Sequence, residues 1–269
     1  NNIADFTKTT KLVSMIGEKS EYEKFIYSKL KKKIQRTFFK KKNSPTILKK
    51  RFIDNVSKNK LFGIYSLNDD ISSSKDDDKI NKYIQKNIEK FDLIIISDYG
   101  HGFISDQTAK KIVAKKKYIA LNAQVNASNV GYHTLQKYRN IDAAIINETE
   151  LRHEMRNKRD DIKKLSIKLQ KRLNTKNLLV TRGKNGAILY DKKSRTFKES
   201  PAFANNVVDK VGAGDAMLSI ISLLIKIGAP KDLSLLLGSF AGASSVETMG
   251  NSASITKKNF LRYIEFSLK

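Results

Sequence analysis

The sequence predicts an α/β fold with a central, mostly parallel sheet flanked by helices, on the strength of three observations. Continuous apolar runs of strand length, such as FDLIIISDYG (91–100), alternate with segments of helical periodicity, which is typical of sheets buried on both faces. Polar residues follow several of these runs, at the edge where parallel sheets bind ligands. A hydrophobic content of 40% over 269 residues is enough for one sizeable core, or for one large and one small domain.

The chain opens with segments that predict a strand and then a helix. TKLVSMIGE (10–18) predicts a buried strand that ends in a glycine turn. SEYEKFIYSKLKKKI (20–34) carries apolar residues at helical intervals, and the spacing of Ser20 and Glu23 matches a capping box. We therefore expect a helix that begins at this pair and continues through the lysine-rich stretch.

Two short apolar segments follow, and they predict a small separate sheet. PTILKKRFID (45–54) and NKLFGIYSL (59–67) each have strand length and composition, so we expect them to pair. NDDISSSKDDDK (68–79) is polar with charges of both signs, which predicts a loop.

From residue 91 onward, strands and helices alternate. Strands are predicted in FDLIIISDYG (91–100), KYIALNAQ (117–124), DAAIINETE (142–150) and NLLVTRGKNGAILYD (177–191), the last as two strands joined by a Gly/Asn turn. Helices are predicted in SDQTAKKIVAKK (105–116, with Ser105 as N-cap), GYHTLQKYR (131–139), ETELRHEMRN (148–157) and IKKLSIKLQKRLN (162–174). The polar residues at the strand ends are Asp98, Asn122, Asn147, Thr181 and the GAGD turn (212–215).

The charge is strongly basic, with 52 Lys+Arg against 27 Asp+Glu and a net charge of +25. Such a balance favours anionic partners, namely nucleotides, phosphorylated metabolites, nucleic acid or an acidic surface. The alternative is that biased composition has simply enriched a solvated surface in lysine. The basic residues are spread along the chain without an aromatic-interleaved basic motif, so nucleic acid is not an expected partner.

Other classes of protein are excluded by what the sequence lacks. There are no cysteines, which excludes disulfides, thiolate metal sites and a cysteine nucleophile. The three histidines do not show metal-ligand spacing. No apolar run approaches the ~20 residues that a membrane span needs, and no signal peptide is visible. We expect a cytoplasmic protein with no membrane partner.

The segment NNVVDKVGAGDAMLSIISLLIKIG (205–228) carries the main chemical signal. Its small residues Gly212, Ala213 and Gly214 let backbone N–H groups converge at a helix start, which forms an anion site. The carboxylate of Asp215 suits such a site if it takes a proton from a hydroxyl group that then attacks phosphorus. The alternative is that Asp215 only caps the helix and that the glycines only form a tight turn.

Two further segments fit the same chemistry. Asn147 and Glu150 lie three residues apart at a strand-to-helix junction, and an amide with a carboxylate suits hydrated Mg²⁺. The alternative is a capping box. In VTRGKNGAILY (180–190), a glycine-containing loop follows Thr181, and Gly186 precedes another strand. Such a loop can lie along a nucleotide, although an ordinary hairpin has the same pattern.

These three segments, in this order, resemble the ribokinase/PfkB family of carbohydrate kinases over nearly the whole chain. Within that family the sequence is most similar to the bacterial heptose-phosphate kinases, the kinase half of ADP-heptose synthase. The supporting segments are IIISDYGHGFIS (94–105) and PTILKKRFID (45–54). The resemblance implies one ribokinase-like domain over residues 1–269, with a small β-sheet lid whose strands lie within about 43–68.

The resemblance also implies ATP, Mg²⁺ and a set of site residues. Asp215 would be the catalytic base, with the anion hole formed by the amides of Gly212, Ala213 and Gly214. Glu150 would hold the metal, and the nucleotide and phosphate side would be lined by Asn147, Thr181, Gly183, Gly186 and Ser239. The sugar or sugar phosphate would be bound by Asn2, Lys49, Arg51, Asp98 and Asp209.

Several positions depart from the family pattern and leave the acceptor open. Lys210 replaces a threonine, His101 replaces the lysine of the S-D-Y-x-K-G segment, and Ser239 stands where an asparagine is often found. The segment Asn122-Ala123-Gln124 replaces D-P-K, so a lysine and a carboxylate are absent.

The chain begins without methionine, in sequence typical of mid-domain segments. The family's first strand and paired-glycine segment are absent, and NNIADF (1–6) matches the tail of that segment, so we expect a fragment. Related kinases can be fused to a nucleotidyltransferase domain, and family lids often form dimer interfaces, so both partners are expected. The alternative function is a catalytically impaired sugar- or nucleotide-binding domain of a larger bifunctional nucleotidyltransferase enzyme.

Overall fold

The computed structural model describes residues 1–54, 56, 60–124, 134–204, 206–209, 211–249 and 254–267. The strands are β1 Thr10–Gly17, β2 Ile34–Lys41, β3 Leu48–Ile53, β4 Lys60–Ser66, β5 Leu93–Asp98, β6 Tyr118–Ala123, β7 Ala143–Asn147, β8 Asn177–Thr181, β9 Ala187–Asp191 and β10 Thr196–Ser200. The helices are α1 Glu23–Lys29, α2 Ser74–Ile88, α3 Asp106–Val113, α4 Glu148–Glu154, α5 Ile162–Leu173, α6 Ala213–Lys226, α7 Lys231–Val246 and α8 Lys257–Ser267. Short 3₁₀ turns are η1 Ala4–Phe6, η2 Leu135–Lys137 and η3 Gly183–Asn185.

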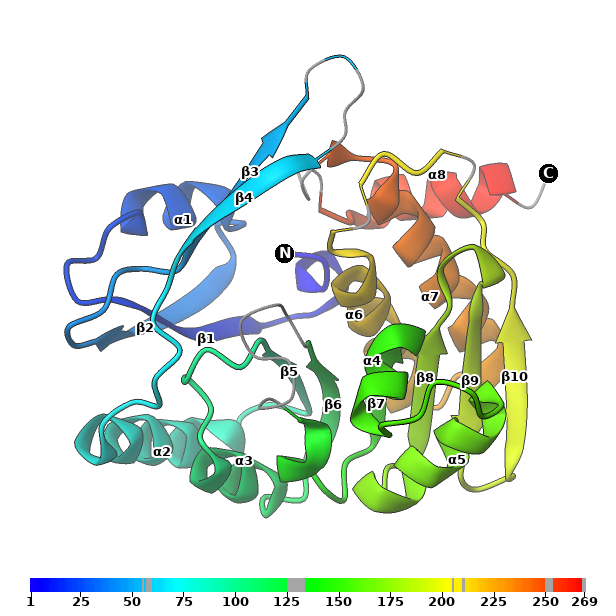
Figure 1. Cartoon of the computed structure of the whole chain (residues 1–269), viewed down its shortest axis with the longest axis horizontal. Coiled ribbons are helices and arrows are strands. Elements are labelled where there is room, and N and C mark those ends of the chain that lie inside the picture. The colour runs from blue at the N-terminus through cyan, green and yellow to red at the C-terminus, as the bar shows by residue number, and fades with distance from the viewer. Residues whose placement is uncertain are drawn as a thin grey trace.

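The central sheet has the strand order β10-β9-β8-β7-β6-β5, with β5 to β8 parallel and β9 and β10 antiparallel (Figure 1). This confirms the predicted mostly parallel α/β sheet. The register pairs Asp98 with Ala123 and Asn147 with Thr181. The polar strand ends predicted from the sequence therefore lie along one edge of the sheet.

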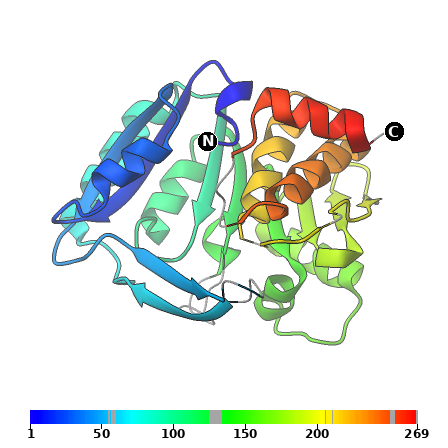
Figure 2. The ribbon, with the colours of Figure 1, turned by 90° about the horizontal axis from the view of Figure 1, so that it is seen from above.

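Alternating side chains of each strand pack against different helices, so both faces are covered (Figures 1 and 2). In β6, Ile119 and Leu121 belong to the core shared with α2, α3, α4 and α5, whereas Ala120 packs on the face covered by α6. α7 packs closely on α6, because a Cβ at Gly238 would lie 2.2 Å from Ile221 Cγ1. α6, whose first turn contains the end of the GAGD segment, is therefore packed between α7 and the sheet.

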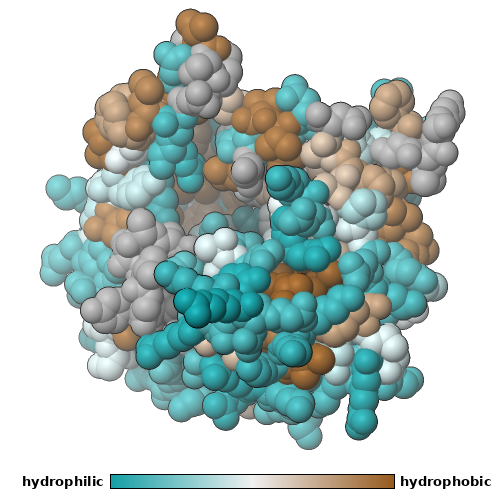
Figure 3. Space-filling model, turned by 45° about the vertical axis from the view of Figure 1, so that its right-hand side comes forward, coloured by the Kyte–Doolittle hydropathy of each residue, from teal (hydrophilic) through white to brown (hydrophobic). Residues whose placement is uncertain are grey.

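Two smaller sheets stand beside the central one. β1 and β2 form a parallel pair, and β3 and β4 form an antiparallel pair that projects from one end of the molecule (Figure 1). The predicted pairing of the two strands near residues 45–67 is confirmed, and we call the β3–β4 sheet the lid. Figure 3 shows a largely hydrophilic face on which hydrophobic side chains gather toward the lid end.

The region of α1 and β2 differs from the prediction. The predicted Ser20–Glu23 capping box is wrong, because α1 begins at Glu23 with Tyr22 as its N-cap and without a side-chain cap bond. The helix ends at Lys29, where the extended backbone of Leu30 follows, so the end of the predicted segment 20–34 is not helical, and β2, which was not predicted, begins at Ile34. Pairing with β1, together with the strand-favouring residues of β2, outweighs the helical spacing of the upstream sequence.

Three further local assignments change. The stretch 68–79 is not all loop: α2 begins at Ser74, and Ser73 caps it by accepting from Asp76 N–H. Of the predicted helix 131–139, residues 131–133 lie outside the described part, and the remainder contains only the short turn η2. β10 was not predicted, whereas the Ser105 cap of α3 is confirmed. Within the described ranges, the structure has no helix long and apolar enough to cross a membrane.

Candidate active site

The site is built where the segment after β5 meets the start of α6. The Asp215 carboxylate is half-buried in the first turn of α6. Tyr99 Oη donates to Asp215 Oδ2 over 2.7 Å, and Ser97 Oγ and Asn122 Nδ2 approach Oδ1 at 3.4 and 3.5 Å. β5, the residue that follows it and β6 thus supply three donors that orient one carboxylate.

Tyr99 acts in this contact as a proton donor and not as a phenolate. Burial raises the pKa of the Tyr99 hydroxyl well above its usual range, and the nearby negative charge of Asp215 raises it further. The hydroxyl therefore stays protonated and is the donor in the bond to Asp215. The bond fixes the orientation of the carboxylate.

The start of α6 has the features of an anion site. Gly212 is the N-cap in a left-handed conformation with φ 88°, and the first N–H groups of a helix have no acceptor within the helix. A Cβ at Gly214 would meet only Asn122 Nδ2, at 3.7 Å. The packing of the protein therefore leaves room for a side chain at Gly214, and the absence of one leaves backbone N–H groups open to a ligand.

The chain before this turn is tied to the end of α7. The backbone N–H groups of Val208 and Asp209 donate to Val246 O at 2.8 and 3.0 Å. Asp209 Oδ1 accepts from Val211 N–H at 3.0 Å, which shapes the approach to Gly212. Asp209 therefore supports the turn in this structure, and Lys210 lies outside the described residues.

Asn147 and Glu150 form the capping box that was the alternative to a metal site. Asn147 Oδ1 accepts from Glu150 N–H at 2.8 Å, and Glu150 Oε2 accepts from Asn147 N–H at 3.1 Å. In the described part of the chain, no group of three or more His, Asp or Glu could hold a metal ion. A Mg²⁺ ion bound to Glu150 would therefore need waters and phosphate oxygens as its other ligands.

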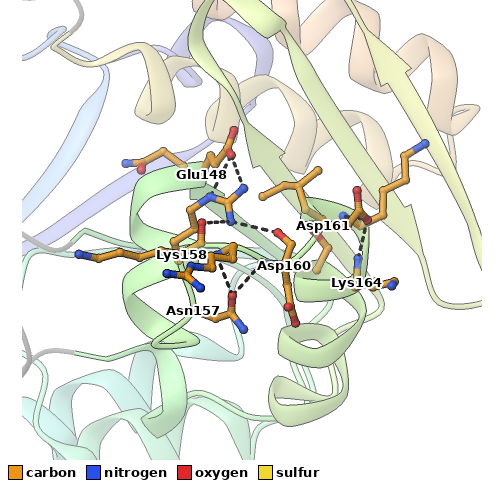
Figure 4. Close-up of polar contacts among 12 residues, drawn as sticks. Glu148, Asn157, Lys158, Asp160, Asp161 and Lys164 are labelled. Carbon is orange, nitrogen blue, oxygen red and sulfur yellow. Dashed lines mark hydrogen bonds and ion pairs between the residues drawn. The ribbon is translucent and has the colours of Figure 1, made fainter.

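Arg152, in the last turn of α4, forms a polar network with residues at the start of α4 and after its end. Its guanidinium donates twice to Glu148 Oε1, at 3.0 and 2.8 Å, and once each to the carbonyls of Lys158 and Asp160, both at 3.1 Å. Figure 4 shows these groups converging at the turn between α4 and α5. The network holds the helix that presents Asn147 and Glu150.

The two glycines of the β8–β9 turn have different reasons to be glycine. Gly186 has φ 74°, and a Cβ there would lie 2.0 Å from Ser200 O. The neighbouring strand β10 thus explains this residue without a ligand. Gly183 has φ 56° with nothing within 4 Å of an added Cβ. The hairpin at the end of β8, after Thr181, is confirmed, and the space around Gly183 is compatible with a nucleotide.

Ser239 lies in α7 and is buried. Among the described residues, its hydroxyl oxygen has no hydrogen-bond partner. Buried hydroxyl groups normally find a partner, so this unpaired oxygen is a departure from the usual pattern.

The residues expected on the sugar side are already engaged. Asp98 is only 5% exposed, and its carboxylate accepts from Gly100 N–H at 3.0 Å and Tyr138 Oη at 2.7 Å, and pairs with Lys137 Nζ at 2.6 Å. Burial, followed by the Asp98 charge, raises the pKa of Tyr138 far above its usual range. Asn2 Oδ1 accepts from the backbone N–H of Ile255 at 3.0 Å.

The lid contributes a cation that reaches the core. Lys49 Nζ lies 2.9 Å from His101 Nε2, and His101 Nδ1 lies 2.5 Å from Asp69 Oδ1. Burial lowers the pKa of Lys49. Arg51 lies on the same face of β3, because the two residues are two apart in the strand.

The sequence signals did not reveal the roles of Tyr99, Ser97 and Asp69, which depend on contacts between distant segments.

Comparisons with known proteins show which sequences and folds this chain is similar to. The model of the pfkB family carbohydrate kinases matches residues 1–258. The bifunctional protein HldE of Nitratiruptor sp. is 23% identical over 231 residues, covering 85% of this chain and 47% of that protein. HldE of Haemophilus influenzae (strain PittEE) is 24% identical over 253 residues, covering 93% and 51%. The chain therefore spans about half the length of the curated relatives it matches.

Solved structures show the same fold at low identity. Phosphofructokinase-2 from Escherichia coli in complex with potassium matches with a TM-score of 0.76 at 13% identity, covering 100% of this chain and 85% of that chain. Ribokinase from Thermotoga maritima matches with a TM-score of 0.73 at 16% identity, covering 96% and 82%. These likenesses confirm the predicted ribokinase-like fold.

Proposed function

Because the chain belongs to the pfkB family of carbohydrate kinases, we propose that it transfers the γ-phosphoryl group of ATP to a hydroxyl group of a phosphorylated sugar. The observation that carries the proposal is the Asp215 carboxylate, held by Tyr99 at the N-terminus of α6. A base beside converging N–H donors suits phosphoryl transfer to an alcohol. Heptose phosphate is the first candidate acceptor, because the segments 45–54 and 94–105 resemble those of heptose-phosphate kinases.

Each residue of the site has a proposed role in the transfer. ATP would supply the phosphoryl group, with Mg²⁺ offsetting the charge of its phosphates. Asp215 accepts the proton of the acceptor hydroxyl as its oxygen bonds to the γ-phosphorus and the bond to the β-phosphate oxygen breaks. The N–H groups at Gly212, Ala213 and Gly214 stabilise the negative charge that moves during the step.

The remaining predicted residues are assigned to binding. Glu150 would hold hydrated Mg²⁺, and the nucleotide would be bound by Asn147, Thr181, Gly183, Gly186 and Ser239. Lys49 and Arg51 would bind the acceptor, since a basic lid strand suits a substrate that carries phosphate. Asn2, Asp98 and Asp209 would shape the acceptor side through the backbone and side-chain contacts described above.

An acceptor screen tests the proposal. The full-length protein with ATP and Mg²⁺ is expected to phosphorylate a heptose 7-phosphate with a kcat/KM at least about tenfold above that for the unphosphorylated heptose, because one charged contact contributes this much. ADP release and mass spectrometry of the sugar measure the reaction. Transfer to none of a panel of sugars and sugar phosphates, with ATP binding retained in calorimetry, would instead support the alternative of a binding domain without turnover.

The HldE relatives are named bifunctional, and this chain matches about half of their length. A nucleotidyltransferase domain, fused or separate, is therefore the proposed protein partner. Such a partner would consume a phosphorylated sugar and a nucleoside triphosphate, and release of pyrophosphate would report its activity.

The lid is also proposed to pair two subunits. Phe52 and Phe62 stack at 4.5 Å, with Ile64 on the same face of the lid, and the three are 41%, 52% and 55% exposed. Burying such a face between two lids removes apolar surface and an open strand edge from water. Sedimentation equilibrium is expected to show a dimer that Phe62→Lys weakens at least about tenfold, by placing a charge in an apolar interface. A monomeric wild-type protein would contradict lid pairing.

A further inference from the structure

Three side chains from separate segments form a hydrogen-bonded chain between the lid and the core. Lys49 comes from β3, His101 from the loop after β5, and Asp69 from the segment between β4 and α2. The His101 ring is 9% exposed, and its two nitrogens lie 2.9 Å from Lys49 Nζ and 2.5 Å from Asp69 Oδ1. The imidazole of His101 thus connects Lys49 of the lid to the carboxylate of Asp69 outside the lid.

Donor and acceptor chemistry fixes the proton positions in this chain. A lysine ammonium can only donate, so His101 Nε2 accepts from Lys49. Nδ1 then carries a ring proton and donates to Asp69, so each ring nitrogen has one fixed role. Asp69 therefore selects the tautomer that can hold Lys49.

The backbone around Asp69 is itself held against the body of the protein. Lys41 Nζ on β2 bonds to the carbonyls of Asn68 and Asp70 at 2.7 and 2.5 Å. Gly102 packs so closely that an added Cβ would lie 2.1 Å from Asp70 O. The carboxylate that orients His101 is thus positioned by contacts that do not involve the lid strands.

The same short loop also carries the group that holds the proposed base. Tyr99 bonds to Asp215, and His101, two residues further on, bonds to Lys49. The loop that holds Asp215 through Tyr99 therefore also holds Lys49 through His101. Its ammonium has three N–H donors, of which His101 takes one, and the remaining donors, together with the guanidinium of Arg51 on the same strand face, suit a phosphate dianion.

We infer that Asp69 and His101 are positioning residues that aim Lys49 at the phosphate group of a phosphorylated sugar acceptor. The inference rests on the proposed function. It adds that the contacts of Lys49 with His101 and of His101 with Asp69 make the enzyme require a phosphate group on its acceptor. A neutral sugar leaves a half-buried cation without its counter-charge, and a site of this kind discriminates against such a ligand.

The test is a double-mutant cycle with two acceptors. Variants Lys49→Met, His101→Phe and the double variant are compared for kcat and KM on a heptose 7-phosphate and on the same heptose without phosphate. We expect Lys49→Met and His101→Phe each to raise the KM for the phosphorylated acceptor by about 10- to 100-fold, the range of a charged hydrogen bond. The double variant is expected to equal Lys49→Met, because His101 acts through Lys49.

Two controls separate positioning from general damage. His101→Gln keeps one acceptor for Lys49 and one donor for Asp69. Its KM for heptose 7-phosphate is therefore expected to lie closer to the wild-type value than that of His101→Phe. Lys50→Met changes a lysine on the opposite face of β3 and is expected to leave KM within about twofold. The KM for ATP is expected to stay unchanged in all these variants, and the losses on the unphosphorylated heptose are expected to be smaller than those on heptose 7-phosphate.

The outcomes distinguish this inference from the proposed function. Multiplicative effects in the double variant, or equal losses on both acceptors, would overturn the inference while the kinase remains. A wild-type kcat/KM that is higher for the unphosphorylated heptose than for heptose 7-phosphate would also overturn the inference and leave the kinase assignment in place. If no acceptor is phosphorylated, the proposed function fails, and calorimetry with heptose 7-phosphate on the same variants still decides whether His101 and Lys49 act together.

Discussion

Asp215→Asn is expected to lower kcat about 1000-fold, within the range that general-base catalysis supplies. The amide keeps the shape of the side chain and can still bond to Tyr99, but it cannot accept the proton of the acceptor hydroxyl. The Kd for ATP is expected to stay within about threefold, because the backbone donors of α6 are unchanged. Steady-state kinetics and calorimetry on the same preparation measure both quantities.

The control for this substitution is Asp232→Asn. Asp232 is a carboxylate in the first turn of α7, and its only close ion pair in the described structure is a 3.9 Å contact with Lys198. We expect kcat to stay within about twofold, as for most surface substitutions. If Asp215→Asn retained wild-type turnover, Asp215 would be excluded as the base.

Gly214→Ala is expected to raise stability and to disable transfer. An added Cβ meets only Asn122 Nδ2 at 3.7 Å, and alanine is the better helix former, so the free energy of unfolding is expected to rise by up to about 1 kcal/mol. The same methyl group covers the N–H groups that would face the transferred phosphoryl group. Loss of such donors typically costs about 100-fold in kcat or more.

Gly186→Ala is the matched control, because both variants add one methyl group to a glycine of the site. Its Cβ would collide with Ser200 O, and its φ of 74° disfavours any side chain. The free energy of unfolding of Gly186→Ala is therefore expected to be about 3 kcal/mol lower than that of the wild-type protein. Chemical denaturation and steady-state kinetics separate the two variants. A fully active Gly214→Ala would refute a close ligand at the start of α6.

The sequence predicted the parts of this molecule that depend on local pattern. Apolar runs ending in Asp98, Asn147 and Thr181 identified parallel strands whose ends share an edge, and the register confirms it. The glycines and the apolar helix after residue 212 located the α6 turn. Both signals are short-range, because the conformational freedom of glycine and the burial of a strand can each be recognised from a few neighbouring residues.

Contacts between distant segments could not be predicted in the same way. Tyr99 and Asp215 are separated by 116 positions, and only the packing of α6 over β5 and β6 brings them together. The two glycines 186 and 214 look equivalent in sequence, yet one is required by a neighbouring strand and the other is not. Segment 34–41 became a strand because β1 offers it a partner.

Rapid-quench measurement of a single turnover tests the central claim most directly, because it observes the chemical step without product release. Asp215→Asn protein saturated with radiolabelled ATP is mixed with excess heptose 7-phosphate, and the labelled sugar is followed over time. We predict that ATP remains bound and that transfer is about 1000-fold slower than in the wild-type protein. Transfer at the wild-type rate would contradict the assignment of Asp215 as the group that takes the hydroxyl proton.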